Sequence, residues 1–220
     1  MTGLPDRDGY FTAWAGLHGG YDPRGSWMVR TWLGWSYALA RPLAAARVPP
    51  DVVTGLGLLV SLGAVSAAWA GGRWALLAAA AVVVSGLVDN LDGAVAVLTE
   101  RASRWGFVLD SVVDRLSDAC YVVALWLLGA AVWLCVVGGA LMGLQEYTRA
   151  RAGAAGMDDV GVVTVWERPT RVITTAMFCL AAGLHVDSAA GWATAGAAAW
   201  VGLGVLGTLQ LLAVVRRRLA

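Results

Sequence analysis

Four aspartates set in apolar sequence are the residues of this chain most suited to chemistry. Asp89 and Asp92 lie in the segment DNLDG, and Asp110 and Asp114 lie in LDSVVD. On helices, spacings of three and four residues put the members of each pair on one face. Four converging carboxylates repel one another unless a divalent cation lies between them. Helix-capping or salt-bridged aspartates are the alternative, but they would explain one or two acids rather than a spaced quartet.

The composition identifies the class of protein. The chain is 59% hydrophobic and 14% charged, with a mean hydropathy of +0.67, far from the values of a soluble domain. We therefore expect an all-α, polytopic membrane protein, in which a buried carboxylate is costly and faces a cavity, a partner or an ion. The net charge of +1 gives no reason to expect a nucleic-acid partner. The first fifty residues carry Asp, Arg and Pro throughout, so no cleavable signal peptide is expected.

The chain divides into three predicted parts. Residues 1–23 are a polar, Gly-rich segment that we expect to be irregular, and residues 24–48 mix Trp and Arg as an amphipathic interfacial helix does. Residues 49–218 form the third part, which has six apolar segments of about the length that crosses a bilayer. These predicted spans are residues 52–70, 74–97, 105–127, 131–148, 170–185 and 192–215.

The arginines predict the topology. A turn near Gly129 places both termini and the loops at 98–104 and 149–171 on one side of the membrane, together with every loop arginine except Arg73. By the positive-inside rule this side is the cytoplasm. The second span then ends, and the third begins, near the cytoplasmic surface. All four aspartates are therefore expected at a similar depth, just below that surface of the cell membrane.

At this point the sequence resembles a known family, the CDP-alcohol phosphotransferases. Their signature is Asp, two residues, Asp-Gly, two residues, Ala-Arg, eight residues, Gly, three residues, Asp, three residues, Asp. The same spacing occurs here in Asp89, Asp92-Gly93, Ala96-Val97, Gly106, Asp110 and Asp114. PPDVVT at 49–54 resembles the family's Pro-Asn-x-x-Thr segment. YTRARA at 147–152 and ERPTR at 167–171 resemble segments of the branch that makes phosphatidylinositol phosphate in actinobacteria and related archaeal lipids.

The resemblance implies an enzyme of phospholipid biosynthesis that transfers a phosphatidyl group from CDP-diacylglycerol to a small polar alcohol and releases CMP. It implies a Mg²⁺ or Mn²⁺ site, with two ions, formed by the four aspartates, and it makes Asp114 the general base as well as a metal ligand. It also implies a homodimer in the membrane. Nucleotide binding is implied for Pro50, Asp51, Thr54, Gly93, Ala96, Arg101 and Gly106.

One position departs from the signature, because Val97 replaces the family's arginine. Arg101 or Arg104 could supply the missing charge, since arginine binds phosphate well. Both could instead face lipid headgroups as ordinary loop residues. The substitution leaves open a non-catalytic paralogue that binds nucleotide or partner subunits. A cation carrier is a further alternative, although the internal repeats common in carriers are not visible.

Four arginines are candidates for binding the acceptor. Arg149, Arg151, Arg168 and Arg171 suit a phosphorylated polyol such as inositol phosphate, because a guanidinium binds phosphate in a bidentate manner. They could instead anchor the protein at the cytoplasmic surface. Serine or glycerol phosphate remains an alternative acceptor.

Overall fold

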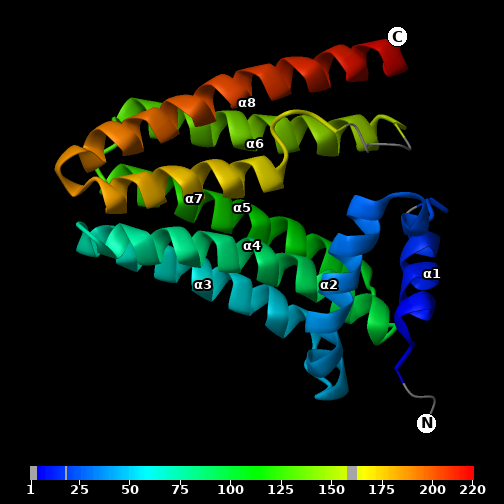
Figure 1. Cartoon of the computed structure of the whole chain (residues 1–220). Helices are drawn as coiled ribbons and strands as arrows, with labels where there is room; N and C mark the ends of the chain where they lie inside the picture. Colours follow the sequence, from blue (N-terminus) through cyan, green and yellow to red (C-terminus); the bar gives the residue numbers. More distant parts are fainter. Residues whose placement is uncertain (1–3, 18, 158–162) are drawn as a thin grey trace. The chain divides into compact units, whose positions relative to one another are not determined.

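The computed structural model describes residues 4–17, 19–157 and 163–220, and in these residues the regular structure is helical throughout. The chain forms two compact units, of which unit 1 holds residues 1–58 and 85–114 and unit 2 holds residues 59–84 and 115–220. The α-helices, labelled in Figure 1, are α1 (Arg7–Leu17), α2 (Trp27–Ala45), α3 (Pro50–Ala70), α4 (Trp74–Leu98), α5 (Arg104–Leu127), α6 (Val132–Ala154), α7 (Arg168–Leu184) and α8 (Ala189–Leu219). Two short 3₁₀ helices, η1 (Pro23–Gly25) and η2 (Val186–Ser188), precede α2 and α8.

The helices follow the predicted segments closely, with two corrections. Helix α6 continues to Ala154, so Arg149 and Arg151 lie on its last turns rather than in a loop. The alanines and arginines of this stretch have high helix propensity and carry the helix past the apolar segment. The second correction concerns residues 1–23, which we expected to be irregular but which contain helix α1.

Helix α1 forms because its aromatic residues find a core in unit 1. Tyr10 and Phe11 are 1% and 2% exposed. The ring of Tyr10 lies 5.7 Å from the ring of Tyr37 on α2. Asp6 accepts a hydrogen bond from the Gly9 amide at 2.8 Å, and this contact caps the helix. The polar composition of the segment concealed an apolar face that packs on α2.

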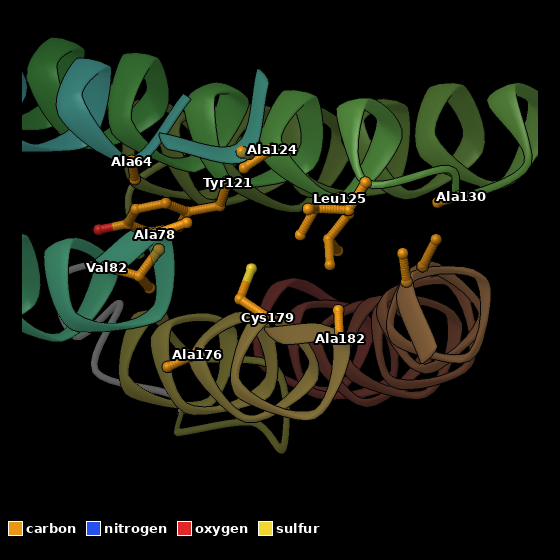
Figure 2. Close-up of a cluster of buried hydrophobic side chains, with 14 of the residues drawn as sticks. Ala64, Ala78, Val82, Tyr121, Ala124, Leu125, Ala130, Ala176, Cys179 and Ala182 are labelled. Atoms are coloured by element: carbon orange, nitrogen blue, oxygen red, sulfur yellow. The ribbon is translucent and has the colours of Figure 1, made fainter. Parts of the chain in front are cut away.

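In unit 2, α6 and α7 pack against α8 (Figure 1). The core of this unit is made largely of alanine, and small residues let membrane helices approach closely. Figure 2 shows Ala78, Ala124 and Ala182 in this core together with Tyr121 and Cys179. The three cysteines of the chain, Cys120, Cys135 and Cys179, are all free and buried.

The turn predicted near Gly129 is confirmed. Helix α5 ends at Leu127 and α6 begins at Val132. Gly129 has a φ of +103°, and a Cβ there would lie 2.7 Å from the Cβ of Ala190. A side chain is therefore excluded both by the backbone conformation and by the neighbouring atom.

Three helices among the described residues are long and apolar enough to cross a bilayer: Pro50–Ala70, Trp74–Leu98 and Val186–Leu219. Helices α5, α6 and α7 correspond to the other three predicted spans. Helix α5 carries several charged residues, and α7 has only 17 residues. The count of six spans and the cytoplasmic placement of the termini stay predictions.

Candidate functional site

Three of the four predicted acids converge within unit 1. One carboxylate oxygen each from Asp89 on α4 and from Asp110 and Asp114 on α5 lie within 4.8 Å of one another. All three side chains are half-buried. Carboxylate oxygens are the ligands that hard divalent cations prefer. The donor set and its geometry therefore fit Mg²⁺ or Mn²⁺.

The fourth acid, Asp92, lies outside this group of three and has partners of its own. Its Oδ2 accepts a hydrogen bond from the Thr54 hydroxyl at 2.6 Å, and its Oδ1 accepts one from the Gly93 amide at 2.6 Å. Only 6% of Asp92 is exposed. A carboxylate that is hydrogen-bonded through both oxygens is fixed in orientation. Thr54, on α3, thus holds Asp92 in place on α4.

A cavity of about 410 Å³ in unit 1 joins the acids to the predicted nucleotide residues. Asp89, Asp92 and Asp110 line it. This volume is within the range of small-molecule sites. All seven residues expected at the nucleotide also line the cavity: Pro50, Asp51, Thr54, Gly93, Ala96, Arg101 and Gly106.

The turn between α4 and α5 places several of these residues. Glu100 has a φ of +55°, and the Arg101 amide donates to the carbonyl of Ala96 at 2.9 Å, which ends α4. Ser103 then accepts a hydrogen bond from the Gly106 amide at 2.9 Å and caps α5. Arg101 is brought to the cavity by this turn.

Val97 and Arg101 both line the cavity. Val97 packs on the apolar core of unit 1. Arg104 is the first residue of α5 and is not among the residues that line the cavity. Of the two arginines considered as substitutes for the family's arginine, the structure therefore brings Arg101 to the site.

The N-terminal helices contribute cavity residues that the sequence did not predict. Tyr10, Trp14 and Leu17 of α1 line the cavity, and so do Trp32, Leu33 and Ser36 of α2. Burial raises the pKa of the Tyr10 hydroxyl to about 12, so this group stays protonated at neutral pH. The signal in the sequence was the spacing of residues 10, 14 and 17, which puts three apolar side chains on one helical face.

The predicted acceptor arginines belong to unit 2, where Arg171 is enclosed by protein groups. Its guanidinium donates to Asp118 at 2.8 Å, to Glu146 at 3.0 Å, to Gln145 at 3.3 Å and to the carbonyl of Trp166 at 3.2 Å. The side chains of Arg171 and Asp118 are 1% and 0% exposed. Arg171 therefore lies in a buried network, whose carboxylates compensate its charge.

The same network extends to Arg149 through a chain of hydrogen bonds. Gln145 donates to the Thr164 hydroxyl at 2.9 Å, and Thr164 donates to Glu167 at 2.8 Å. Glu167 also pairs with Arg149 at 2.5 Å. The guanidinium of Arg149 is therefore oriented by a carboxylate that is itself held in place.

Arg151 and Arg168 have different surroundings. Arg151 is exposed near the end of α6, whereas Arg168 is half-buried at the first turn of α7. Arg115, which we had not singled out, pairs with Glu146 and lies 3.6 Å from Asp118. Glu146 thus pairs with Arg115 and Arg171, and Glu167 pairs with Arg149.

The comparisons with known proteins agree with the acidic motif. Residues 47–209 match the family described as CDP-alcohol phosphatidyltransferase. The archaetidylinositol phosphate synthase of Pyrococcus horikoshii is 29% identical over 163 residues, which cover 71% of this chain and 84% of that enzyme. The phosphatidylinositol phosphate synthase of Mycobacterium tuberculosis is 35% identical over 147 residues, which cover 61% of this chain and 64% of that enzyme.

Two crystal structures of the mycobacterial synthase are also similar. The structure with bound CDP-diacylglycerol has a TM-score of 0.69 and 27% sequence identity, and the match covers 82% of this chain and 92% of that chain. The structure with manganese and citrate has the same score and identity, and the match covers 88% of that chain. The family match takes in the converging carboxylates and the predicted nucleotide residues. We conclude that this chain belongs to the CDP-alcohol phosphatidyltransferase family.

Proposed function

We propose that the protein transfers a phosphatidyl group from CDP-diacylglycerol to a phosphorylated polyol such as inositol phosphate, and releases CMP. The observation that carries the proposal is the convergence of Asp89, Asp110 and Asp114 within 4.8 Å, beside a cavity that holds the predicted nucleotide residues. The names of the related synthases support the choice of donor and acceptor.

The donor would bind with its cytidine and pyrophosphate in the cavity of unit 1. A divalent ion held by Asp89, Asp110 and Asp114 would neutralise the pyrophosphate and stabilise the CMP leaving group. Asp92, fixed by Thr54 at 2.6 Å, would complete the acidic side of the cavity. Arg101 would add a positive charge at the turn between α4 and α5.

The reaction is a displacement at phosphorus. The acceptor oxygen forms a bond to the phosphorus that carries the diacylglycerol, and the bond from that phosphorus to the bridging oxygen of the pyrophosphate breaks. The electron pair leaves with CMP. Asp114 takes the proton of the acceptor hydroxyl, and a carboxylate base suits a reaction in which positioning and charge supply most of the rate enhancement.

Arg149, Arg151 and Arg168 are the residues that we propose for the acceptor's phosphate. Arg149 is 16% exposed and its guanidinium is oriented by Glu167, as expected for a preorganised anion-binding group. Arg171 is assigned a positioning role instead, because its guanidinium already binds Asp118 and Glu146. It fixes the buried network to which Arg149 is joined.

Topology and assembly are part of the same proposal. A site at the cytoplasmic face would let the acyl chains remain in lipid while cytidine and acceptor enter from water. Labelling of single cysteines at positions 101 and 150 should place both on the cytoplasmic side. Cross-linking in membranes should give a homodimer.

The deciding experiment is CMP release by the purified full-length protein in detergent with Mg²⁺ or Mn²⁺. Inositol phosphate, glycerol phosphate, serine and inositol are supplied in turn with CDP-diacylglycerol. CMP release with inositol phosphate, and loss of release on chelation of the metal, support the proposal. Release with an uncharged acceptor alone overturns the acceptor assignment. No release with any acceptor overturns the catalytic proposal in favour of a non-catalytic paralogue.

A further inference from the structure

One wall of the cavity beside the acids is formed by residues that precede the part of the sequence matched by the family. The match begins at residue 47, whereas Tyr10, Trp14 and Leu17 of α1 and Trp32, Leu33 and Ser36 of α2 all line the cavity. The N-terminal helices thus add aromatic surface to a site whose acidic side belongs to the family. No role for these residues follows from the signature itself.

The wall is held firmly on unit 1. Arg24 donates to the carbonyl of Asp8 at 2.9 Å, and its guanidinium lies 5.7 Å from the ring of Phe11. Tyr37 on α2 donates to the carbonyl of Pro5 at 3.3 Å. These contacts fix the N-terminal half of α1 against its neighbours, which helps to preorganise the cavity side of α1.

Trp14 is the residue of this wall best placed to meet a ligand. Tyr10 and Leu33 are almost completely buried and act as its support. Trp14 is half-buried, and its ring meets that of Tyr21 edge to face at 6.3 Å. An indole presents a large flat face together with one N–H donor, and is suited to stacking on a planar heterocycle.

The rest of the lining favours a nucleobase over an acyl chain. Ser36, Asn90 and Ser103 line the cavity with polar groups that can pair with the edges of a base, and that a hydrocarbon chain would leave unpaired. Val97 also lines it, where the family has an arginine. Position 97 itself offers the donor no cationic contact, and aromatic stacking can add affinity beside the charge that Arg101 supplies.

We propose that Trp14 stacks on the cytosine of the CDP-linked donor, so that the N-terminal helix α1 forms part of the nucleotide site. This inference rests on the proposed function for the identity of the nucleotide. The aromatic wall then determines donor affinity without contacting the reacting atoms, and Trp14 is a binding residue rather than a catalytic one.

The test measures binding of CDP and of inorganic pyrophosphate to the full-length protein in detergent with Mn²⁺. Trp14→Ala should weaken CDP binding about tenfold, since stacking of a base on an aromatic ring is typically worth that order. Pyrophosphate lacks a base, so its affinity should not change. Trp14→Phe should restore most of the CDP affinity. Trp35→Ala is the matched control, because Trp35 is a 67% exposed α2 residue that does not line the cavity.

The outcomes separate this inference from the proposed function. Unchanged CDP binding by Trp14→Ala overturns the inference, even if the wild-type protein releases CMP. If Trp14→Ala weakens CDP and pyrophosphate binding equally, α1 only supports the fold, and the inference is again overturned. If Trp14→Ala raises the KM for CDP-diacylglycerol but leaves CDP binding normal, the aromatic wall contacts the acyl chains rather than the base. That result also overturns the inference. Trp14-dependent CDP binding in a protein that releases no CMP upholds the inference while the catalytic proposal fails.

Discussion

The guanidinium of Arg171 donates a hydrogen bond to the carboxylate of Asp118 at 2.8 Å, and neither side chain reaches solvent. Removing one member of a buried ion pair leaves the other charge uncompensated, which typically costs about 3–5 kcal/mol. We therefore expect Asp118→Leu to lower the thermal unfolding midpoint markedly. Arg216→Gln, at an exposed arginine of α8, should leave the midpoint unchanged.

The double variant Asp118→Leu/Arg171→Met provides the second measurement for this pair. Removing both charges should recover part of the lost stability, because two apolar side chains replace an unpaired charge. The double variant should therefore be more stable than the sum of the two single losses implies. Simple additivity would show that the two side chains are not energetically coupled.

The sequence predicted most of the acidic site because spacing alone determines which helical face a residue occupies. Asp110 and Asp114 are four residues apart and do converge with Asp89. Asp118 continues the same spacing, yet it binds Arg171 and Arg115. Spacing along one helix thus could not separate a metal ligand from a structural acid, since the choice depends on partners distant in the chain.

The N-terminal part was predicted least well. Five Gly and three Asp residues within residues 1–23 indicated an irregular segment, whereas Tyr10 and Phe11 form an aromatic cluster with α2. A short helix of this kind is stable through tertiary packing rather than propensity. The position of Trp14 at the cavity could not be predicted for the same reason.

Removing one carboxylate from the acidic cluster should abolish activity while the protein stays folded. Asp110→Ala should abolish CMP release, because three ligand oxygens would be reduced to two. The variant should remain folded, since removing one charge from a repelling group does not destabilise it. Mn²⁺ should raise the unfolding midpoint of the wild-type protein but not that of the variant. Asp187→Ala, at an exposed acid of η2, is the control; near-normal activity of Asp110→Ala would rule out the metal site.

Thr54 provides a test of how Asp92 is held. Thr54→Val keeps the shape of the side chain but removes the 2.6 Å hydrogen bond to Asp92. A hydrogen bond to a charged group contributes about 1.5–3 kcal/mol, so we expect kcat/KM to fall about tenfold or more. Thr99→Val is the matched control, because Thr99 lies just after α4 and its hydroxyl donates to the carbonyl of Val95 on the last turn of that helix. Equal effects of the two changes would exclude a specific role for Thr54.

The arginine of the family signature can be restored by a substitution at Val97. The residue lines the cavity, so Val97→Arg should bring a guanidinium to the donor's phosphates. We expect a lower KM for CDP-diacylglycerol, with acceptor KM unchanged. Val97→Lys separates a bidentate contact from a simple charge. An enzyme that is fully active and unaffected by either change would show that the family's arginine is dispensable in this chain.

The remaining question is whether the arginines of unit 2 bind the acceptor or anchor the protein. Anchoring requires only a positive charge, so lysine should replace arginine without loss. Phosphate binding by a guanidinium depends on its planar fork, which lysine cannot reproduce. Arg149→Lys, Arg151→Lys and Arg168→Lys should all insert normally in the membrane. At least two of them should raise the KM for inositol phosphate about tenfold or more, with little effect on the KM for CDP-diacylglycerol.

Arg171→Lys should behave differently from these three. Its guanidinium binds Asp118, Glu146 and Gln145 at once, and an ammonium cannot satisfy this geometry. We expect a lower unfolding midpoint together with a raised acceptor KM, because Arg149 is oriented through the same network. Unchanged acceptor KM in all four variants would identify these arginines as membrane anchors. An uncharged preferred acceptor would lead to the same conclusion, since a phosphate would then be absent from the step that they are proposed to serve.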